Sequence, residues 1–460
     1  MDRRHSATGD LTVGGITGTM LRFAAPLMAG NLLQQAYNIV DTLIVGRFLG
    51  ASALAAVGSS YTLMVFITSV FIGLCMGSGA VFSMQYGARN FKGLRRSLFS
   101  SLLLIGAVTV VLNLASLLLL QSIVRWLQVP AQLVTMTCDY LFIVLLGMVG
   151  VSLYNFCAYL LRSLGNSMVP LLFLAFSVVL NIALDLLFIA VFDWGVSGAA
   201  AATVIAQYAA AAGLVRYLRV KFPELWPRRG ECRFDRQSLR EIFAFSSLTC
   251  LQQSVMNFGI LMVQGLVNRF GVAVMAAFAA AVKIDSFAYM PVQDFGNAFS
   301  TFVAQNFGAG RMDRIRRGVR SALLVTTLFS LSLSAIIFWA APALMRIFVT
   351  PDSGEIVRIG VTYLRVEGSF YLGIGLLFLL YGFYRAVRMP ALSVVLTVLS
   401  LGTRVLLAYL LATIPTIGVN GIWWSIPIGW LLADTFGIIC YMRLKNRLRM
   451  APDAERRAAA

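Results

Sequence analysis

The fold of this chain is decided by stretches such as residues 101–120, which read SLLLIGAVTVVLNLASLLLL. This stretch holds no charged side chain, and a helix that crosses a bilayer needs about 20 predominantly apolar residues. Similar runs recur between basic or turn-rich breaks along the whole sequence. The sequence therefore predicts an all-α integral membrane protein.

The composition supports this class. Only 12% of the 460 residues are charged and 59% are hydrophobic, whereas an average soluble domain carries about 25% charged residues. Most of the surface is therefore expected to face lipid. The net charge of +18 comes from basic residues in the connectors between apolar runs, and we attribute it to membrane topology rather than to nucleic-acid binding.

We expect twelve transmembrane helices, because twelve apolar runs are long enough to span the bilayer. The predicted spans are residues 21–46, 53–86, 97–121, 137–161, 169–191, 196–218, 242–268, 273–307, 320–341, 357–384, 390–412 and 419–443.

The basic residues also predict the orientation of these spans. Of the 37 Lys and Arg residues, 29 lie on one side of the predicted helices and four on the other. Short cytoplasmic loops collect Lys and Arg. With an even number of spans, both termini are then expected on the cytoplasmic side of the cell (inner) membrane.

Several classes of site and enzyme find no support in the sequence. The six cysteines are scattered without C-x-x-C spacing, and the single histidine, His5, lies in the polar amino-terminal stretch, so neither a disulfide framework nor a transition-metal site is predicted. Residues 1–19 lack the apolar core and cleavage site of a secretory signal. Without a G-x-x-x-x-G-K-[ST] or D-D-x-x-D motif, we expect neither an ATPase nor any other enzyme, and no cofactor.

An internal repeat organises the chain. A shift of 221 residues places Phe-Gly-Val-Ala at 270–273 on Leu-Gly-Ala-Ser at 49–52, and a shift of 223 places Gly418-Val-Asn-Gly421 on Gly195-Val-Ser-Gly198. Two similar six-helix halves are therefore predicted, related by a pseudo-two-fold axis along the membrane normal with a central cavity between them. The predicted division is an N-terminal half at 1–218, a cytoplasmic linker at 219–241, a C-terminal half at 242–443 and a cytoplasmic basic tail at 444–460.

Several short motifs in a fixed order then resemble those of a known family. They include Val45-Gly-Arg-Phe-Leu-Gly50, Leu161-Arg-Ser-Leu-Gly-Asn166, Asn181-Ile-Ala-Leu-Asp185 and Gln305-Asn-Phe-Gly-Ala-Gly310. Together with the repeat they resemble the multidrug and toxic compound extrusion (MATE) family of efflux transporters, prokaryotic type, over nearly the whole chain. The resemblance implies a V-shaped arrangement of twelve helices.

Ionisable groups at membrane depth are costly and are therefore functional candidates. A rise of 1.5 Å per residue puts Asp41, Asp185 and Thr203 in the outer half of the bilayer. Asp41 ends a polar stripe on the first helix, and Asn181 lies one turn from Asp185. The stripe could be a polar seam between helices, or the two acids could bind and release a proton near neutral pH or hold Na⁺. The other members of the stripe, which are candidate cavity or substrate contacts, are Gln34, Tyr37 and Asn38.

The resemblance favours the second alternative. In one branch of the MATE family the proton or cation site comprises an Asp on helix 1, an Asn and an Asp four apart on helix 5, and a Thr on helix 6. The matching residues here are Asp41, Asn181, Asp185 and Thr203. The repeat offsets carry these positions onto residues that do not duplicate the site in the second half.

The second half carries its own charges within predicted spans: Lys283, Asp285, Arg365, Glu367 and Arg404. They could form a neutralised network that holds this half rigid. Alternatively, Asp285 or Glu367 could be a second cation or substrate contact. The amides Gln253 and Asn257 are further cavity candidates.

The sequence thus predicts a secondary active antiporter that exports amphipathic or cationic organic compounds in exchange for H⁺ or Na⁺. The expected partners are small organic substrates and the lipid bilayer, with no nucleic acid, and a monomer is expected. The alternative is a flippase for lipid-linked saccharides, which would need a cationic groove for a pyrophosphate, and only Lys283 and Arg404 could supply it.

Overall fold

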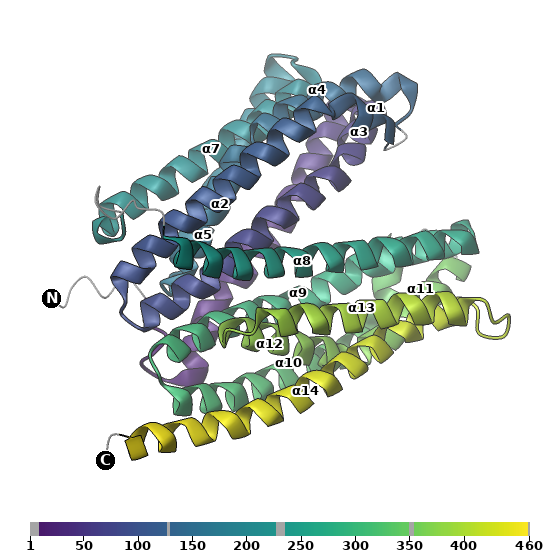
Figure 1. Cartoon of the computed structure of the whole chain (residues 1–460). Coiled ribbons are helices and arrows are strands. Elements are labelled where there is room, and N and C mark those ends of the chain that lie inside the picture. Colours follow the sequence, from purple (N-terminus) through teal and green to yellow (C-terminus); the bar gives the residue numbers. More distant parts are fainter. Residues whose placement is uncertain (1–8, 127–128, 227–234, 349–353, 459–460) are drawn as a thin grey trace. The chain divides into compact units, whose positions relative to one another are not determined.

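The computed structural model of the chain describes residues 9–126, 129–226, 235–348 and 354–458, and every regular element in these ranges is a helix (Figure 1). A backbone surrounded by lipid has to satisfy its N–H and C=O groups internally, and a helix does so within one segment. The all-α prediction is confirmed. His5, Cys232 and part of the predicted linker lie outside the described residues.

The first helix, α1 (Ile16–Gly87), contains two predicted spans. At 1.5 Å per residue its 72 residues cover about 108 Å, far more than the roughly 30 Å core of a bilayer. Gly50 interrupts the helix with φ 83° and ψ −175°. Because glycine lacks a Cβ, it adopts this conformation without steric cost, and it separates the two predicted spans inside what is otherwise continuous helix.

The other helices follow the predicted order. The first half continues with α2 (Phe91–Leu118), α3 (Leu120–Trp126), η2 (Ala131–Leu133), α4 (Val134–Leu146), α5 (Met148–Ser163), α6 (Met168–Asp185), η3 (Leu186–Val191), α7 (Gly195–Lys221) and η4 (Pro223–Leu225). The second half comprises α8 (Arg236–Val267), η5 (Asn268–Phe270), α9 (Val272–Gly308), α10 (Met312–Phe348), α11 (Gly354–Gly368), α12 (Tyr371–Ala386), α13 (Pro390–Ala412) and α14 (Val419–Ala458).

Within the described ranges, nine helices are long and apolar enough to cross a membrane. Two pairs of shorter helices, each bent at a short break, raise the number of candidate spans to eleven if each pair counts as one span. The pairs bend by 41° between α4 and α5 and by 50° between α11 and α12. Since α1 holds two of the predicted spans, these elements account for all twelve. The helix α14 continues as helix into the predicted basic tail.

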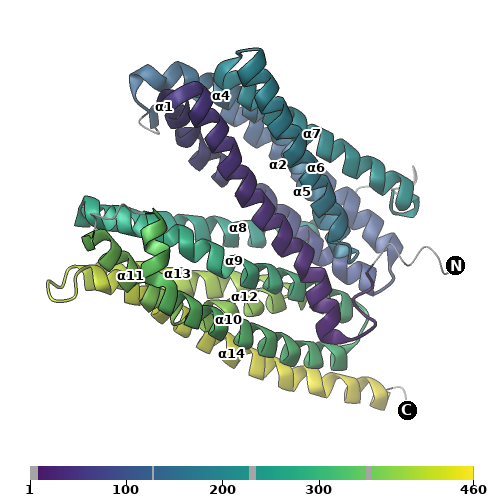
Figure 2. The same cartoon turned by 180° about the vertical axis from the view of Figure 1, so that it is seen from behind.

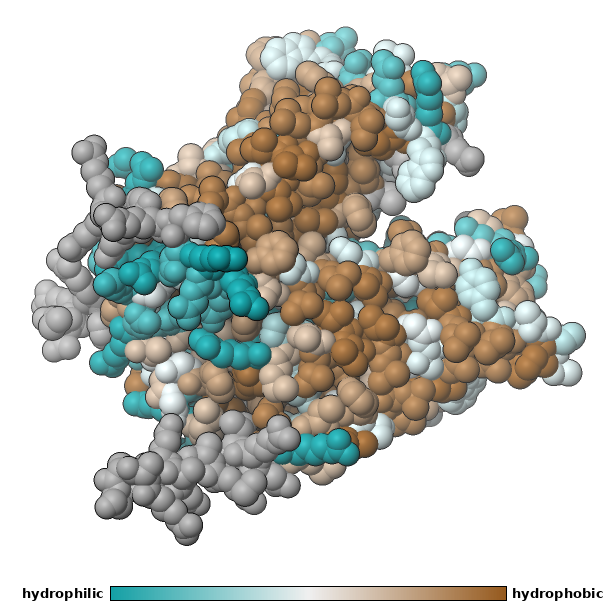
Figure 3. All heavy atoms as spheres, viewed as in Figure 1, coloured by the Kyte–Doolittle hydropathy of each residue, from teal (hydrophilic) through white to brown (hydrophobic). Residues whose placement is uncertain are grey.

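The surface of the helices is apolar, as a lipid-facing surface has to be. Large hydrophobic side chains such as Val111, Leu118 and Leu328 are 60% or more exposed. Figure 3 shows hydrophobic residues covering the middle of the helices, with hydrophilic residues gathered near helix ends.

The sequence repeat reappears in the backbone. Gly50 and Gly271, which are 221 residues apart, share an unusual conformation, with φ of 83° and 96°. Other left-handed residues also occur in pairs at the repeat offsets: Arg89 with Gly310, Gly165 with Arg388, and Gly195 with Gly418. The two bent helix pairs are equivalent as well, because Gly147 maps onto Phe370. Each half therefore repeats the other's turns, even where the residue type has changed.

Contacts divide the chain into two compact units. The first comprises residues 1–254 and 301–315, and the second comprises residues 255–300 and 316–460. The turn between α9 and α10 thus groups with the first unit, although the rest of both helices belongs to the second.

Inside the first unit, α1 lies along α5, α6 and α7 (Figure 2). Small side chains allow the helix backbones to approach closely, and α7 supplies a run of buried alanines, including Ala199, Ala200 and Ala202. An apolar cluster that contains Ile44, Val45 and Ile189 packs beside the polar residues of the candidate site.

Candidate functional site

Three helices of the first unit bring the predicted coupling residues together. Asp41 comes from α1, Asn181 and Asp185 from α6, and Thr203 from α7. Asp185 is fully buried and Asn181 is 2% exposed. The α-helix changes into the wider π-helical turn η3 directly after Asp185, and such local irregularities occur often at functional sites.

The Asn181 amide joins the two helices that carry the site. Only one of the two amide orientations gives both the nitrogen and the oxygen a hydrogen-bond partner. In that orientation the amide nitrogen donates to Asp185 Oδ2 at 2.8 Å, and the amide oxygen accepts from the backbone N–H of Thr203 at 3.1 Å. Asn181 therefore fixes the position of the Asp185 carboxyl group relative to α7.

The carboxyl groups of Asp41 and Asp185 lie close enough to interact with each other. An ionised carboxylate can only accept hydrogen bonds, so a hydrogen bond between these two groups forms only when one of them carries a proton. Each acid also has a buried Oδ1 atom without a hydrogen-bond partner. The pair therefore has acceptor capacity for a proton or a cation.

The polar stripe of α1 is only partly directed at this site. Tyr37 reaches Thr203, with 3.5 Å between the two hydroxyl oxygens. Gln34 instead donates to Asn38 at 3.5 Å, and Asn38 donates to Gln35 at 3.4 Å. Two members of the predicted stripe therefore bond along their own helix.

Sequence reasoning missed Tyr140 as a member of the site. This residue of α4 packs against the apolar cluster beside the site, and its hydroxyl interacts electrostatically with Asp41 and Asp185. The only sequence signal was its match to Tyr363 at the repeat offset. Tyr363 in turn interacts with Glu367 and Asp285 in the second half.

The second unit contains a separate acidic cluster. Asp285 on α9 and Glu367 on α11 are 4% and 3% exposed. Tyr371 donates to Asp285 Oδ1 at 2.7 Å. Arg404 on α13 interacts electrostatically with both acids, while its Nε atom and Glu367 Oε2 lack hydrogen-bond partners.

The remaining predicted residues of the second half differ in their surroundings. Lys283 is exposed. Arg365 sits over the Phe338 ring at 5.1 Å and donates to the Phe338 carbonyl oxygen. On α8, Gln253 and Asn257 are both half-buried. In the described part of the chain, no group of three or more His, Cys, Asp or Glu side chains is arranged to hold a metal ion.

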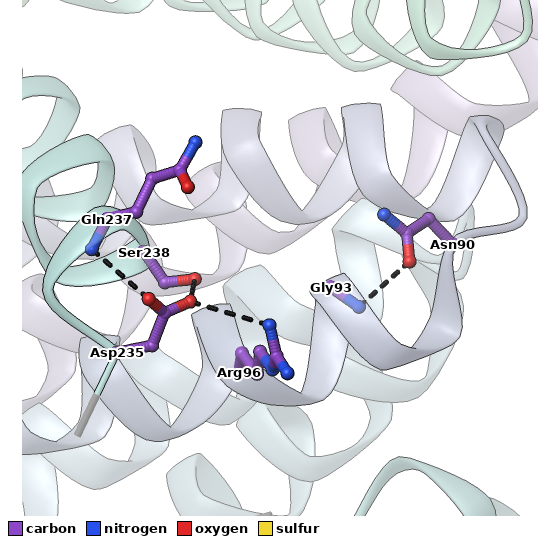
Figure 4. A network of polar contacts seen from close by, with 6 residues as sticks. All are labelled: Asn90, Gly93, Arg96, Asp235, Gln237 and Ser238. Carbon is purple, nitrogen blue, oxygen red and sulfur yellow. Dashed lines mark hydrogen bonds and ion pairs between the residues drawn. The ribbon is translucent and has the colours of Figure 1, made fainter. Parts of the chain in front are cut away.

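A polar network joins the start of α8 to α2 (Figure 4). Asp235 accepts from Ser238 Oγ at 2.7 Å and from the backbone N–H of Gln237 at 3.2 Å, and it lies 3.8 Å from Arg96. These donors, Ser238 first, hold the pKa of the Asp235 carboxyl group below its usual value. At the start of α2, Asn90 accepts from the backbone N–H of Gly93 at 2.9 Å and caps that helix.

Comparisons with known proteins agree with this architecture. A family model described as MatE matches the chain twice, over residues 26–187 and 249–410, one match for each copy of the repeat. The "Probable multidrug resistance protein YpnP" of Bacillus subtilis is 30% identical over 394 residues, which covers 85% of this chain and 87% of that protein.

The "Multidrug export protein MepA" of Staphylococcus aureus is 24% identical over 435 residues, covering 93% and 94% of the two chains. Among solved structures, a MOP superfamily transporter from Pyrococcus furiosus aligns with a TM-score of 0.89 at 22% identity, covering 96% and 98%. The chain therefore belongs to the MatE family, whose members are multi-pass membrane transporters rather than enzymes and need no cofactor.

Proposed function

We propose that this protein is a secondary active antiporter that exports amphipathic or cationic organic compounds in exchange for protons. Asp41, Asn181, Asp185 and Thr203 form its coupling site. The names of the relatives in Bacillus subtilis and Staphylococcus aureus, a multidrug resistance protein and a multidrug export protein, support the substrate class. The interaction between the neighbouring carboxyl groups of Asp41 and Asp185 is the observation that carries the coupling mechanism.

This contact favours protons over Na⁺ as the coupling ion. Two ionised carboxylates repel each other and cannot donate to each other, so a shared proton would stabilise the close approach of Asp41 and Asp185. Na⁺ would instead need the carboxylate oxygens to turn toward the metal, with Asn181 and Thr203 adding neutral oxygen ligands. Na⁺ coupling is therefore the alternative that an experiment has to distinguish from proton coupling.

The two protonation states of the Asp41–Asp185 pair differ in their affinity for a cationic substrate. With negative charge on the pair, the site attracts a cationic substrate. A further proton neutralises the pair, weakens the hold on that substrate and lets the cluster be buried at much lower cost than two carboxylates. Protonation therefore shifts the equilibrium between open and closed states through their different stability. Pro26 lacks a backbone N–H, which makes this part of α1 a candidate for the moving element.

The driving force is sufficient for export. One charge that moves down a potential of about 100 mV supplies about 2.3 kcal/mol. That energy sustains roughly a 50-fold substrate gradient before any contribution from pH.

The membrane topology is part of the proposal. Both termini and the linker at 219–241 are cytoplasmic, the protein is a monomer in the cell (inner) membrane, and residues 1–218, 242–443 and 444–460 form the two halves and the tail. The basic-residue asymmetry and the two family-model matches support this arrangement. Labelling of a cysteine at Glu224 from outside intact cells would contradict it.

The second half supplies most of the substrate contacts in this proposal. Its buried acids Asp285 and Glu367 attract a cationic substrate, and its amides Gln253 and Asn257 form hydrogen bonds with it. The amides Gln34 and Asn38 on α1 are the candidate contacts from the first half.

The decisive experiment measures efflux of a cationic dye from proteoliposomes with pH and Na⁺ gradients imposed separately. We expect the pH gradient alone to drive export and the Na⁺ gradient alone to be ineffective. Asp41→Asn should abolish gradient-driven export, because the amide keeps the size and most hydrogen bonds but cannot be titrated.

The matched control is Asp139→Asn on α4, which removes an exposed carboxylate next to Tyr140. This variant should export at the wild-type rate. Wild-type export by Asp41→Asn would remove Asp41 from the mechanism, and export driven by Na⁺ alone would replace the proton as the coupling ion.

A further inference from the structure

The turn between α9 and α10 is held by parts of the chain far away in sequence. We call residues 301–315 the foot, because they end α9, start α10 and group with the first unit. A Cβ atom on Gly87 would collide with the carbonyl oxygen of Gln305, and one on Gly308 would collide with the carbonyl oxygen of Met84. The ends of α1 and α9 therefore touch backbone to backbone at two glycines that are equivalent in the repeat.

The contact involves a second segment, residues 9–15, which we call the strap. Gln305 of the foot is fully buried and bonds in two directions. Its side-chain oxygen accepts from the backbone N–H of Leu11 at 3.0 Å, and its nitrogen donates to the carbonyl oxygen of Ser163 on α5 at 2.7 Å. Asn306 donates to the Leu11 carbonyl oxygen at 3.2 Å. Two amides of the foot thus bind the strap and the end of α5 together.

Two arginines of the foot also donate hydrogen bonds to the strap. Arg311 donates to the Thr12 carbonyl oxygen at 2.7 Å. Arg314 donates to the carbonyl oxygens of Val13 at 2.7 Å and Gly14 at 2.8 Å. A guanidinium group forms strong, charge-assisted hydrogen bonds with a fixed fork geometry. Successive carbonyl groups of a segment without regular structure are thereby held by two cationic side chains.

The strap is shaped for this role and leads directly into the helix that carries the coupling site. Asp10 Oδ1 accepts from both the backbone N–H and the hydroxyl of Thr12, at 2.8 and 2.6 Å. Leu11 and Thr12 are only 2% and 8% exposed. Helix α1 begins at Ile16, one residue after the strap, and continues to Asp41.

We propose that the strap and the foot form a clasp that locks this end of the transporter, and that release of the clasp is a step of the transport cycle. The inference rests on the proposed antiport function, since alternating access requires the two halves to open in turn at opposite ends. The foot continues into the second unit through α9 and α10, and the strap continues into α1. Opening at this end in which α9 and α10 carry the foot with them breaks the clasp, and the clasp then sets how often that happens.

The test compares two double variants of the full chain, each of which removes two positive charges from residues 311–320. Arg311→Gln/Arg314→Gln breaks the clasp. Arg317→Gln/Arg320→Gln is the control, because both side chains are exposed and neither is part of the clasp. Each variant also carries Ser163→Cys as a reporter. Ser163 is 2% exposed and its carbonyl oxygen is covered by Gln305, so the thiol becomes accessible when the foot leaves.

Inverted membrane vesicles are treated with a membrane-impermeant maleimide, and modification at position 163 is followed by mass spectrometry of that peptide. Hydrogen exchange of residues 9–15 is measured on the purified variants. We expect the clasp variant to label about tenfold faster or more, because several charge-assisted hydrogen bonds are lost. Strap exchange should rise in parallel, and the rate of gradient-driven dye export should change, with none of these effects in the control.

Equal labelling in the two variants would overturn the clasp as a lock. Faster labelling with export unchanged would overturn its role in the transport cycle. If the parent protein drives no export with either gradient, the proposed function fails, and the labelling comparison still decides whether the strap and foot hold this end closed.

Discussion

Exchanging Asn181 and Asp185, in the double variant Asn181→Asp/Asp185→Asn, tests whether coupling depends on where the second carboxyl group lies. The variant keeps the composition, net charge and volume of α6. The amide and the carboxyl group remain one turn apart and can still interact with each other. The change is that the carboxyl group moves one turn along α6, away from Asp41.

The geometry gives the size of the effect. Four residues of helix correspond to about 6 Å of rise along α6, so two carboxyl groups that face each other across α1 and α6 at about 3 Å separate to about 7 Å. At an effective dielectric constant of about 20, the interaction of two full charges falls from about 5 to about 2.5 kcal/mol over that change. The shared hydrogen bond is lost entirely. We therefore expect the pair to stop acting as one proton-binding unit.

The assay is dye export from proteoliposomes across a range of external pH values, with dye binding to the purified variant measured in parallel. We expect gradient-driven export to fall at least tenfold while thermal unfolding stays within a few degrees of the parent. Dye affinity in the parent should decrease as pH falls and should vary much less in the swapped variant. Export by the swapped variant at the parental rate, with the parental pH profile, would refute the pairwise mechanism.

Three further outcomes are expected. Tyr140→Phe should reduce gradient-driven export several-fold without loss of folded protein in the membrane, because its hydroxyl interacts with both acids of the coupling site; parental export would place Tyr140 in packing alone. Tyr371→Phe should lower stability by about 1–3 kcal/mol, because Asp285 Oδ1 loses its donor, and an unchanged unfolding temperature would contradict this. The pKa of Asp235 is lowered in the folded protein, so its contribution is present above the unfolded pKa of about 3.9 and is lost as pH falls through the lower folded value. Hydrogen exchange at the start of α8 should therefore rise at acid pH in the parent and be high at every pH in Asp235→Ala; identical profiles would exclude this contribution of Asp235.

Much of the fold follows from hydropathy and glycine placement. Twelve apolar runs predict twelve spans because lipid leaves the backbone few alternatives to helix. The sequence alone did not reveal that the first two spans join through Gly50 within one helix, because a helix break of one residue leaves no gap in the hydropathy pattern. Likewise, the bends near Gly147 and Phe370 fall inside apolar runs and depend on packing against neighbouring helices.

The site was predictable in part for a similar reason. Charges at membrane depth are rare, so Asp41 and Asp185 stand out, and the structure brings them together with Asn181 and Thr203. Tyr140 does not stand out, because tyrosine is common in transmembrane helices and only the packing of α4 brings it to the acids. Lys283 and Arg365 also stood out in the sequence, but the structure does not place them in the acidic cluster. Their depth along the helix was readable, but the face they occupy depends on neighbours that belong to other helices.

The turn residues with a left-handed backbone conformation suggest substitutions that would raise the stability of the folded protein. Arg89 and Arg388 have φ of 53° and 64°, whereas glycine occupies the equivalent position of the other half in both cases. A left-handed conformation costs a non-glycine residue roughly 1–2 kcal/mol, so each half tolerates at one turn a strain that the other half avoids. The duplicated copy thus serves as a natural template for engineering: Arg89→Gly and Arg388→Gly each transfer to one half the turn chemistry that the other already uses.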